Sequence, residues 1–179
     1  MGMSSRRHEI LDAAVRVLGA EGPRGLTHRA IDREAGLPLG STANLFGRRT
    51  ELLQGIVARM EELDRAQWSH DPGPVQDLEA LAHALERMIR AIAEPPLNRV
   101  QKARYYLQME LPEETAETNR RLGAELQQMV RALGGTAEDT GVVLAALDGL
   151  MLRGVTYGPG ALPAEGEMAT ALLRLMRGD

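Results

Sequence analysis

The most informative segment of the chain is Glu34-Ala35-Gly36-Leu37-Pro38-Leu39-Gly40-Ser41-Thr42, which has the composition of a tight turn between two short helices. Before the turn, residues 27–35 have helical spacing of apolar side chains, with Thr27 as a plausible N-cap and Gly36 in the stop position. After the turn, we expect a short helix over residues 38–46, because Pro38 suits a first helical turn.

The flanking sequence extends this helical pattern in both directions. We expect a helix over residues 5–20 before the pair and a long helix over residues 49–70 after it. Three short helices followed by a long one is the sequence outline of a helix-turn-helix unit. In such a unit the second helix of the pair enters the major groove of DNA, and the first crosses the backbone.

The remaining chain is also predicted to be helical, and no stretch alternates convincingly as a strand would. The expected helices cover residues 75–93, residues 97–110, a segment opening at Pro112 and closed by Gly134-Gly135, a segment reaching Tyr157, and residues 163–176. The predicted fold is therefore all-α with nine helices.

Composition excludes several classes of protein. The chain has 179 residues, 44% of them hydrophobic and 26% charged, which is ordinary for a globular protein. It has no cysteine, which excludes disulfides and thiolate metal sites. No apolar run is long enough to cross a bilayer, and the first seven residues lack the apolar core of a signal peptide, so we expect a cytoplasmic protein without a membrane partner.

Catalytic signals are also missing from the sequence. The four histidines, His8, His28, His70 and His83, are scattered, and none forms a metal-ligand spacing. There is no nucleophile elbow and no phosphate-binding glycine loop. We therefore expect a protein that is not an enzyme and that carries neither a metal nor a cofactor.

Charge is distributed unevenly along the chain. The net charge is -4, yet residues 1–60 carry nine arginines against six acidic residues, and the remainder is strongly acidic. A basic N-terminal segment weakly favours nucleic-acid binding at that end.

The N-terminal residues resemble a known family. Ile10-Leu11-Asp12-Ala13-Ala14, Leu26-Thr27, the turn quoted above, Leu45-Phe46 and Arg49 with Glu51-Leu52-Leu53 have the spacing of the N-terminal domain of TetR-family transcriptional regulators. The match covers about residues 6–55. The resemblance implies a helix-turn-helix DNA-binding domain over residues 1–48 and an effector-binding and dimerisation domain over residues 49–179. It also implies a regulator, in most cases a repressor, that binds a palindromic operator as a homodimer.

Candidate DNA contacts follow from this resemblance and from the polarity of the short helices. Small polar side chains on the second helix suit base edges, and Asn44 is the best reader because a carboxamide pairs bidentately with adenine. The alternative for each residue is a solvated or capping role. The candidates are Arg6, Thr27, His28, Arg29, Leu39, Gly40, Ser41, Thr42, Asn44, Arg48 and Arg49.

The sequence also departs from the family pattern. Ala43 stands where the family usually has tyrosine, Leu45 where it often has histidine or tyrosine, and Pro38 where it commonly has serine. The lost tyrosine removes an expected phosphate or packing contact. The alternative function is therefore a degenerate relative that binds a ligand or a protein without specific DNA binding.

The last two predicted helices are apolar on more than one face, which indicates burial against a second copy. The resemblance implies the same homodimer. The alternative is a monomer core that covers both faces. The candidate interface residues are Val142, Ala146, Leu150, Gly154, Leu172 and Leu175.

Methionine and aromatic side chains gather in the middle helices. Such side chains commonly fill gaps in a core, and they also line apolar pockets. The resemblance implies a pocket for a small-molecule effector among the fourth to seventh helices. The candidate pocket residues are Met60, Trp68, Met88, Tyr105, Tyr106, Met109, Met129 and Met151.

Overall fold

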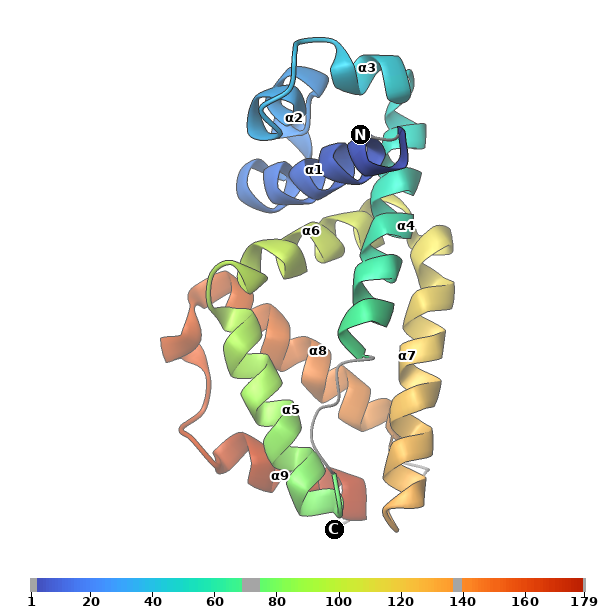
Figure 1. Cartoon of the computed structure of the whole chain (residues 1–179). Coiled ribbons are helices and arrows are strands. Elements are labelled where there is room, and N and C mark those ends of the chain that lie inside the picture. Colours follow the sequence, from blue (N-terminus) through green and yellow to red (C-terminus); the bar gives the residue numbers. More distant parts are fainter. Residues whose placement is uncertain (1–2, 69–74, 137–139, 179) are drawn as a thin grey trace. The chain divides into compact units, whose positions relative to one another are not determined.

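The computed structural model describes residues 3–68, 75–136 and 140–178, and in these residues the protein is all-α, as predicted (Figure 1). The nine α-helices of the described residues are α1 (Met3–Gly25), α2 (His28–Glu34), α3 (Ser41–Leu45), α4 (Arg49–Trp68), α5 (Leu78–Ala93), α6 (Leu97–Glu110), α7 (Pro112–Ala132), α8 (Thr140–Tyr157) and α9 (Glu167–Arg177). A short 3₁₀ helix, η1 (Pro159–Ala161), precedes α9.

Three helices begin later than predicted, each directly after a glycine or an aspartate in the N-cap position. Helix α3 begins at Ser41 instead of Pro38, since Gly40 takes the left-handed conformation (φ 94°) at its N-cap. Helix α5 begins after Asp77, whose side chain accepts a hydrogen bond from the Ala80 N–H at 2.8 Å. Helix α9 begins at Glu167 instead of Pro163, after a second left-handed glycine.

The first helix was predicted to end at residue 20, and the structure has a kink two residues later, at Gly22 within α1. Gly22 has φ 71° and ψ -174°, values that are not helical, and Pro23 follows it. A positive φ is accessible to glycine without steric cost, so this residue lets the chain change direction. The part of α1 before the kink therefore ends close to the predicted residue 20, and a short helical turn continues to Gly25.

The chain packs as two compact units. Unit one contains residues 1–70 and 99–116, and unit two contains residues 71–98 and 117–179. This division differs from the predicted boundary between residues 48 and 49, because α4 and α6 pack with the N-terminal helices. The predicted boundary separates a DNA-binding domain from an effector-binding and dimerisation domain, and this functional division remains a prediction.

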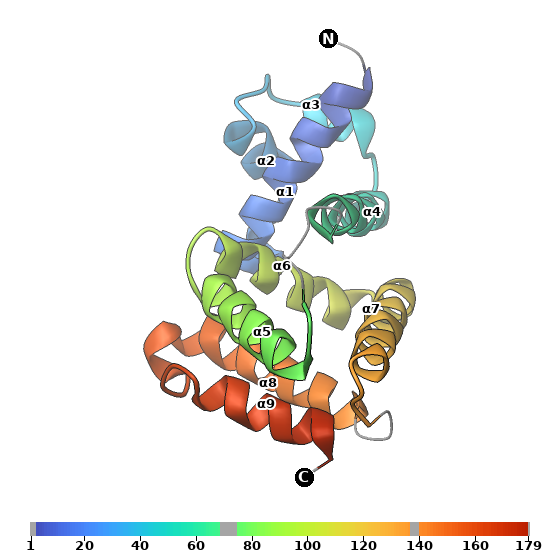
Figure 2. The ribbon, with the colours of Figure 1, turned by 60° about the horizontal axis from the view of Figure 1, so that its bottom comes forward.

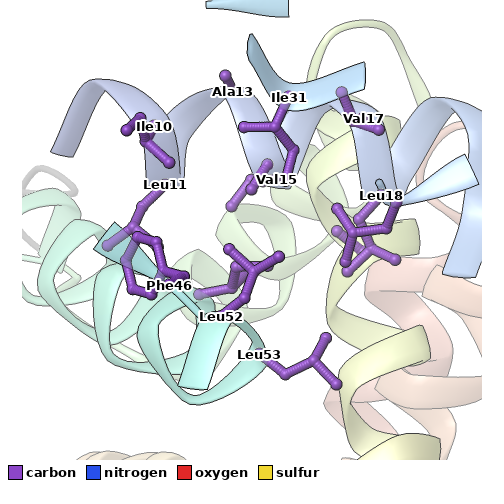
Figure 3. Close-up of a cluster of buried hydrophobic side chains, with 14 of the residues drawn as sticks. Ile10, Leu11, Ala13, Val15, Val17, Leu18, Ile31, Phe46, Leu52 and Leu53 are labelled. Atoms are coloured by element: carbon purple, nitrogen blue, oxygen red, sulfur yellow. The ribbon is translucent and has the colours of Figure 1, made fainter. Parts of the chain in front are cut away.

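The core of unit one holds the N-terminal helices on α4 (Figure 3). Ile10 and Leu18 on α1 and Ile31 on α2 are fully buried together with Phe46, which follows α3, and Leu52 on α4. Full burial of one such side chain contributes roughly 1.5–3 kcal/mol. The orientation of the short helices α2 and α3 therefore depends on this shared core.

Ion pairs across helices reinforce unit one. The Arg59 guanidinium on α4 donates to both carboxylate oxygens of Asp12 on α1, at 2.7 and 3.1 Å. Arg104 on α6 binds both oxygens of Asp64 on α4 in the same way, at 2.8 and 2.7 Å. Bidentate pairs of this kind fix geometry as well as proximity. Helices α1, α4 and α6 are therefore joined by directional contacts in addition to the apolar core.

In unit two, α5 packs against α8 and α9, and α8 lies beside α9 (Figure 2). The core between them includes Ile89, Val143, Leu172 and Met176, and Val130 of α7 joins the same cluster. This core leaves part of the surface of α8 uncovered within unit two, as described below.

A buried carboxylate fixes the start of α9. Glu86 on α5 is only 3% exposed, and it accepts hydrogen bonds from the Gly166 N–H at 2.9 Å, the Ala169 N–H at 3.3 Å and Arg90 at 2.8 Å. Burial tends to raise the pKa of Glu86, but the bonds from Arg90, Gly166 and Ala169 outweigh it, so the pKa lies below the ordinary value. Glu86 therefore acts as an N-cap for α9 from another helix.

Candidate DNA interface

The first candidate, Thr27, caps α2. Its backbone is extended (φ -119°, ψ 152°), and its hydroxyl oxygen accepts a hydrogen bond from the Ala30 N–H at 3.2 Å. This confirms the predicted N-cap. His28 and Arg29 occupy the first turn of α2, where His28 is half-buried and Arg29 is exposed.

A buried acid that sequence reasoning missed holds the turn between α2 and α3. Asp32 on α2 is fully buried, and one carboxylate oxygen accepts hydrogen bonds from the Thr42 N–H at 2.8 Å and the Thr42 hydroxyl at 2.6 Å. The other carboxylate oxygen accepts from the Gly40 N–H at 2.7 Å. Asp32 therefore fixes α3 relative to α2 through three short bonds to its first turn.

This network corrects the prediction for Thr42. The side chain of Thr42 is fully buried, and its hydroxyl proton is committed to Asp32. It is therefore not available to a base edge or a phosphate. Thr42 is a structural partner of Asp32 and not a DNA contact.

The charge state of Asp32 follows from the same contacts. Burial tends to raise the pKa of this carboxyl group. The hydrogen bonds from Thr42 and Gly40 and the nearby His28 outweigh burial and hold the pKa below its ordinary value. Asp32 is therefore ionised at neutral pH, and the turn is held by charge-assisted hydrogen bonds.

The outer side of the turn exposes the other candidates. Leu39 is 77% exposed, Asn44 is exposed, and Ser41 is half-buried with its hydroxyl donating to the Pro38 carbonyl at 2.6 Å. No atom lies within 4 Å of the position that a Cβ on Gly40 would occupy. The α2–α3 turn and α3 together thus present one apolar and two polar side chains beside the open backbone at Gly40.

The arginines of unit one divide into two groups. Arg49 donates to the carbonyls of Leu26 at 3.3 Å and Pro23 at 3.1 Å, so part of its guanidinium ties α4 to the last turn of α1 and to the segment that follows it. Arg7 lies over the Phe46 ring, 4.7 Å from its centroid. Arg6, Arg29 and Arg48 are among the exposed arginines whose side chains form no hydrogen bond or ion pair within the described part of the chain.

Most of the predicted dimer-interface residues that remain accessible lie on α8. Val142 is 53% exposed, and Ala146 and Leu150 are partly buried, as is Leu175 on α9. Two predicted interface residues lie inside unit two instead. Leu172 is 1% exposed in the core, and Gly154 is buried, with Ala93 and Leu162 at 3.0 and 3.3 Å from a Cβ placed on it. The prediction is corrected for both, because the protomer itself covers them.

The predicted pocket residues are distributed over both units. Met60 and Tyr106 join the core of unit one, and Tyr105 is half-buried. Met109 is 70% exposed. The other methionines of the set, Met88, Met129 and Met151, pack against the core of unit two. The side chain of Trp68 lies outside the described residues. The pocket remains a prediction.

Two further expectations from the sequence concern metal sites and membrane-spanning helices. Among the described residues, no group of three or more His, Asp or Glu side chains is placed to hold a metal ion. The described helices also include none that is both long and apolar enough to span a bilayer.

The arrangement of α1–α3 on α4 defines a three-helix helix-turn-helix unit, the class of protein that uses its second short helix to read DNA. Solved structures show the same architecture over nearly the whole chain. The multidrug binding protein EbrR, solved with ethidium, shares 27% identity, covers 96% of this chain and 98% of its own, and has a TM-score of 0.69. A member of the TetR family from Streptomyces coelicolor A3 shares 28% identity with the same coverages and a TM-score of 0.67.

A TetR-like transcriptional regulator from Rhodococcus sp. RHA1, at 19% identity and a TM-score of 0.63, shares the fold and covers 98% of this chain and 96% of its own. No family model matches the chain, and no curated protein matches it. The solved structures support the assignment of this chain to the TetR family and confirm the nine-helix TetR architecture of the described residues. They support a DNA-binding regulator.

Proposed function

We propose that this protein is a transcriptional repressor that binds a palindromic operator as a homodimer and releases it when a small-molecule effector binds. The observation that carries the DNA-binding part is the rigid turn between α2 and α3, held by Asp32 with Leu39, Ser41 and Asn44 on its outer side. A fixed outer face is what base reading requires, because base contacts depend on the position of each side chain.

The unpaired arginines supply the phosphate contacts of this proposal. Arg29 lies on the first turn of α2, Arg48 immediately before α4, and Arg6 near the start of α1. Phosphate contacts position a protein on the duplex, and base contacts specify the site. Three arginines in each helix-turn-helix unit of the dimer would neutralise about six phosphates. The logarithm of the DNA-binding constant should therefore fall linearly with the logarithm of the salt concentration, with a slope of about -5.

Selection of bound sequences from random duplex DNA tests this function. We expect an inverted repeat whose half-sites are centred about 34–36 Å apart, one helical turn. On the selected operator, Arg29→Ala should weaken binding to all sequences and reduce the salt slope by about 2 per dimer. Asn44→Ala should instead relax the preference at one base position of each half-site. Binding without any salt-dependent DNA term would favour the alternative, a ligand- or protein-binding module.

The homodimer part of the proposal rests on α8. Val142 and Leu152 are 53% and 51% exposed, and Ala145 lies exposed near them on the helix. A Cβ on Gly141 or Gly149 would meet nothing within 4 Å in the protomer. Small residues on an exposed apolar face allow two helices to approach closely, and a two-fold related copy would cover this face.

Sedimentation velocity at micromolar concentration tests the dimer. Leu152→Glu places a charge on the α8 face and should convert the dimer to a monomer, because an unpaired buried carboxylate is costly. Leu97→Glu on α6 is the matched control, since Leu97 is also partly exposed, at 37%, and lies away from α8 in the sequence. A wild type that sediments as a monomer would refute the homodimer.

The effector part of the proposal takes its support from EbrR, which was solved in complex with ethidium and with malachite green. We propose that this chain takes a small apolar or aromatic effector, which binds best to the dimer state whose half-site spacing does not match the operator. In unit one, the Arg59–Asp12 ion pair joins α4 to α1, and the Arg104–Asp64 ion pair joins α6 to α4. A displacement of α4 would therefore carry α1 with it. Operator affinity that stays unchanged at saturating effector would refute release.

A further inference from the structure

Leu39 is the most exposed of the large hydrophobic residues in the described parts of the chain. It is 77% exposed, and it lies in the turn between α2 and α3, one residue before the N-cap of α3. An isolated exposed leucine on a surface needs no special explanation. Its position on the proposed reading face and the rigidity of its backbone distinguish this one.

The backbone on both sides of Leu39 is fixed by hydrogen bonds. Before it, the Leu37 N–H donates to the Asp32 carbonyl at 2.9 Å, and the Pro38 carbonyl accepts from the Ser41 N–H at 3.1 Å and the Ser41 hydroxyl at 2.6 Å. After it, the Gly40 N–H donates to the buried Asp32 carboxylate at 2.7 Å. Leu39 therefore cannot turn into the core without breaking bonds on either side, and its outward orientation is a fixed feature of the turn.

The chemistry of the side chain selects its partner. Leucine offers no hydrogen-bond donor or acceptor, so it cannot read the polar groups that guanine, cytosine and adenine present in the major groove. Thymine alone presents an apolar group there, the 5-methyl group. Building on the proposed function, we propose that Leu39 is a specificity-determining residue that reads a thymine in each half-site by apolar contact with its 5-methyl group.

Deoxyuridine substitution tests this proposal, because it removes the methyl group and leaves the pairing edge unchanged. In the operator selected by the wild-type protein, each thymine of the half-site is replaced in turn, symmetrically in both halves, and Kd is measured by fluorescence anisotropy. Removing one buried methyl should weaken binding about 4-fold, and removing both should weaken it about 15-fold. We expect this loss at one thymine position.

The protein variants complete the cycle. Leu39→Ala should lose about the same affinity for the thymine operator and should bind the thymine and deoxyuridine operators equally well at that position. Leu63→Ala is the matched control, because Leu63 on α4 is also partly exposed, at 38%, and lies outside the turn. It should keep the wild-type affinity and the wild-type loss on deoxyuridine substitution.

The outcomes separate this inference from the proposed function. A selected operator that contains no thymine in its half-site, or in which no deoxyuridine weakens binding, overturns thymine reading while DNA binding stands. A Leu39→Ala variant that remains sensitive to deoxyuridine at every position where the wild type is sensitive overturns it as well. If the wild type selects no sequence, the proposed function fails first, and thymine reading fails with it.

Discussion

Replacing Asp32 with alanine removes the central acceptor of the turn between α2 and α3. The substitution leaves the Gly40 N–H, the Thr42 N–H and the Thr42 hydroxyl without the carboxylate that accepts from them at 2.6–2.8 Å. A hydrogen bond to a charged group contributes about 1.5–3 kcal/mol, and the three are not additive because water enters the vacated space. We therefore expect the free energy of unfolding to fall by about 3–5 kcal/mol.

Thermal unfolding followed by circular dichroism measures this loss at a fixed protein concentration. For a chain of this length, 1 kcal/mol shifts Tm by about 2–4 °C, so Asp32→Ala should lower Tm by about 6–20 °C. Asp32→Asn should lose less, about 1–3 kcal/mol, because its amide oxygen still accepts two of the three hydrogen bonds.

The matched control is another carboxylate on the same helix. Glu34 is 41% exposed and pairs with Arg16 at 2.6 Å at the surface. Because exposed ion pairs contribute about 0–1 kcal/mol, Glu34→Ala should change stability by no more than that. If Asp32→Ala and Glu34→Ala lower Tm equally, or if Asp32→Ala leaves Tm unchanged, the reasoning about the turn is refuted.

Three further predictions concern stability. Because the folded-state pKa of Asp32 lies below its unfolded value, its contribution is complete above about pH 4 and is lost as pH falls through the folded pKa. The stability difference between the wild type and Asp32→Asn should therefore be constant from pH 5 to 8 and shrink below about pH 4, as urea titrations at each pH would show. A stability difference that grows on acidification would contradict the lowered pKa of Asp32. In urea titrations, Glu86→Gln should lower the free energy of unfolding by about 1–3 kcal/mol, because the N–H donors of α9 lose a charged acceptor. The control, Glu79→Gln on the exposed side of α5, should change the free energy of unfolding by less than about 0.5 kcal/mol. Gly19→Ala should lower Tm markedly, since its Cβ would overlap the backbone oxygen of Arg99. An unchanged Tm would show that α1 and α6 do not approach so closely.

Local signals in the sequence were sufficient to predict much of the fold. The Thr27 cap, the apolar stripe of α1 and the position of the turn after Glu34 are encoded by residues within a few positions of each other, and all three are confirmed. The start of α9 was predicted wrongly because its capping acceptor, Glu86, lies 80 residues away in the sequence. A cap supplied from another helix leaves no local pattern.

The candidate site was predicted less completely, for a related reason. From its local sequence, Thr42 looks like a solvated residue on a short polar helix. Its burial depends on Asp32, which lies ten residues earlier in the chain. One signal was available: Asp32 directly follows the buried Ile31 on a short helix whose buried side it shares. An acid at such a position requires hydrogen-bond donors, and Thr42 and Gly40 are the donors that the fold supplies.

The central claim is that the outer face of the α2–α3 turn lies in the major groove of an operator. Dimethyl sulfate footprinting on the selected operator tests it most directly, because the reagent methylates guanine N7 in the major groove and adenine N3 in the minor groove. We expect protection of guanine N7 in two patches about one helical turn apart, with adenine N3 within those patches still reactive. Protection confined to adenine N3, or a single unpaired patch, would contradict it.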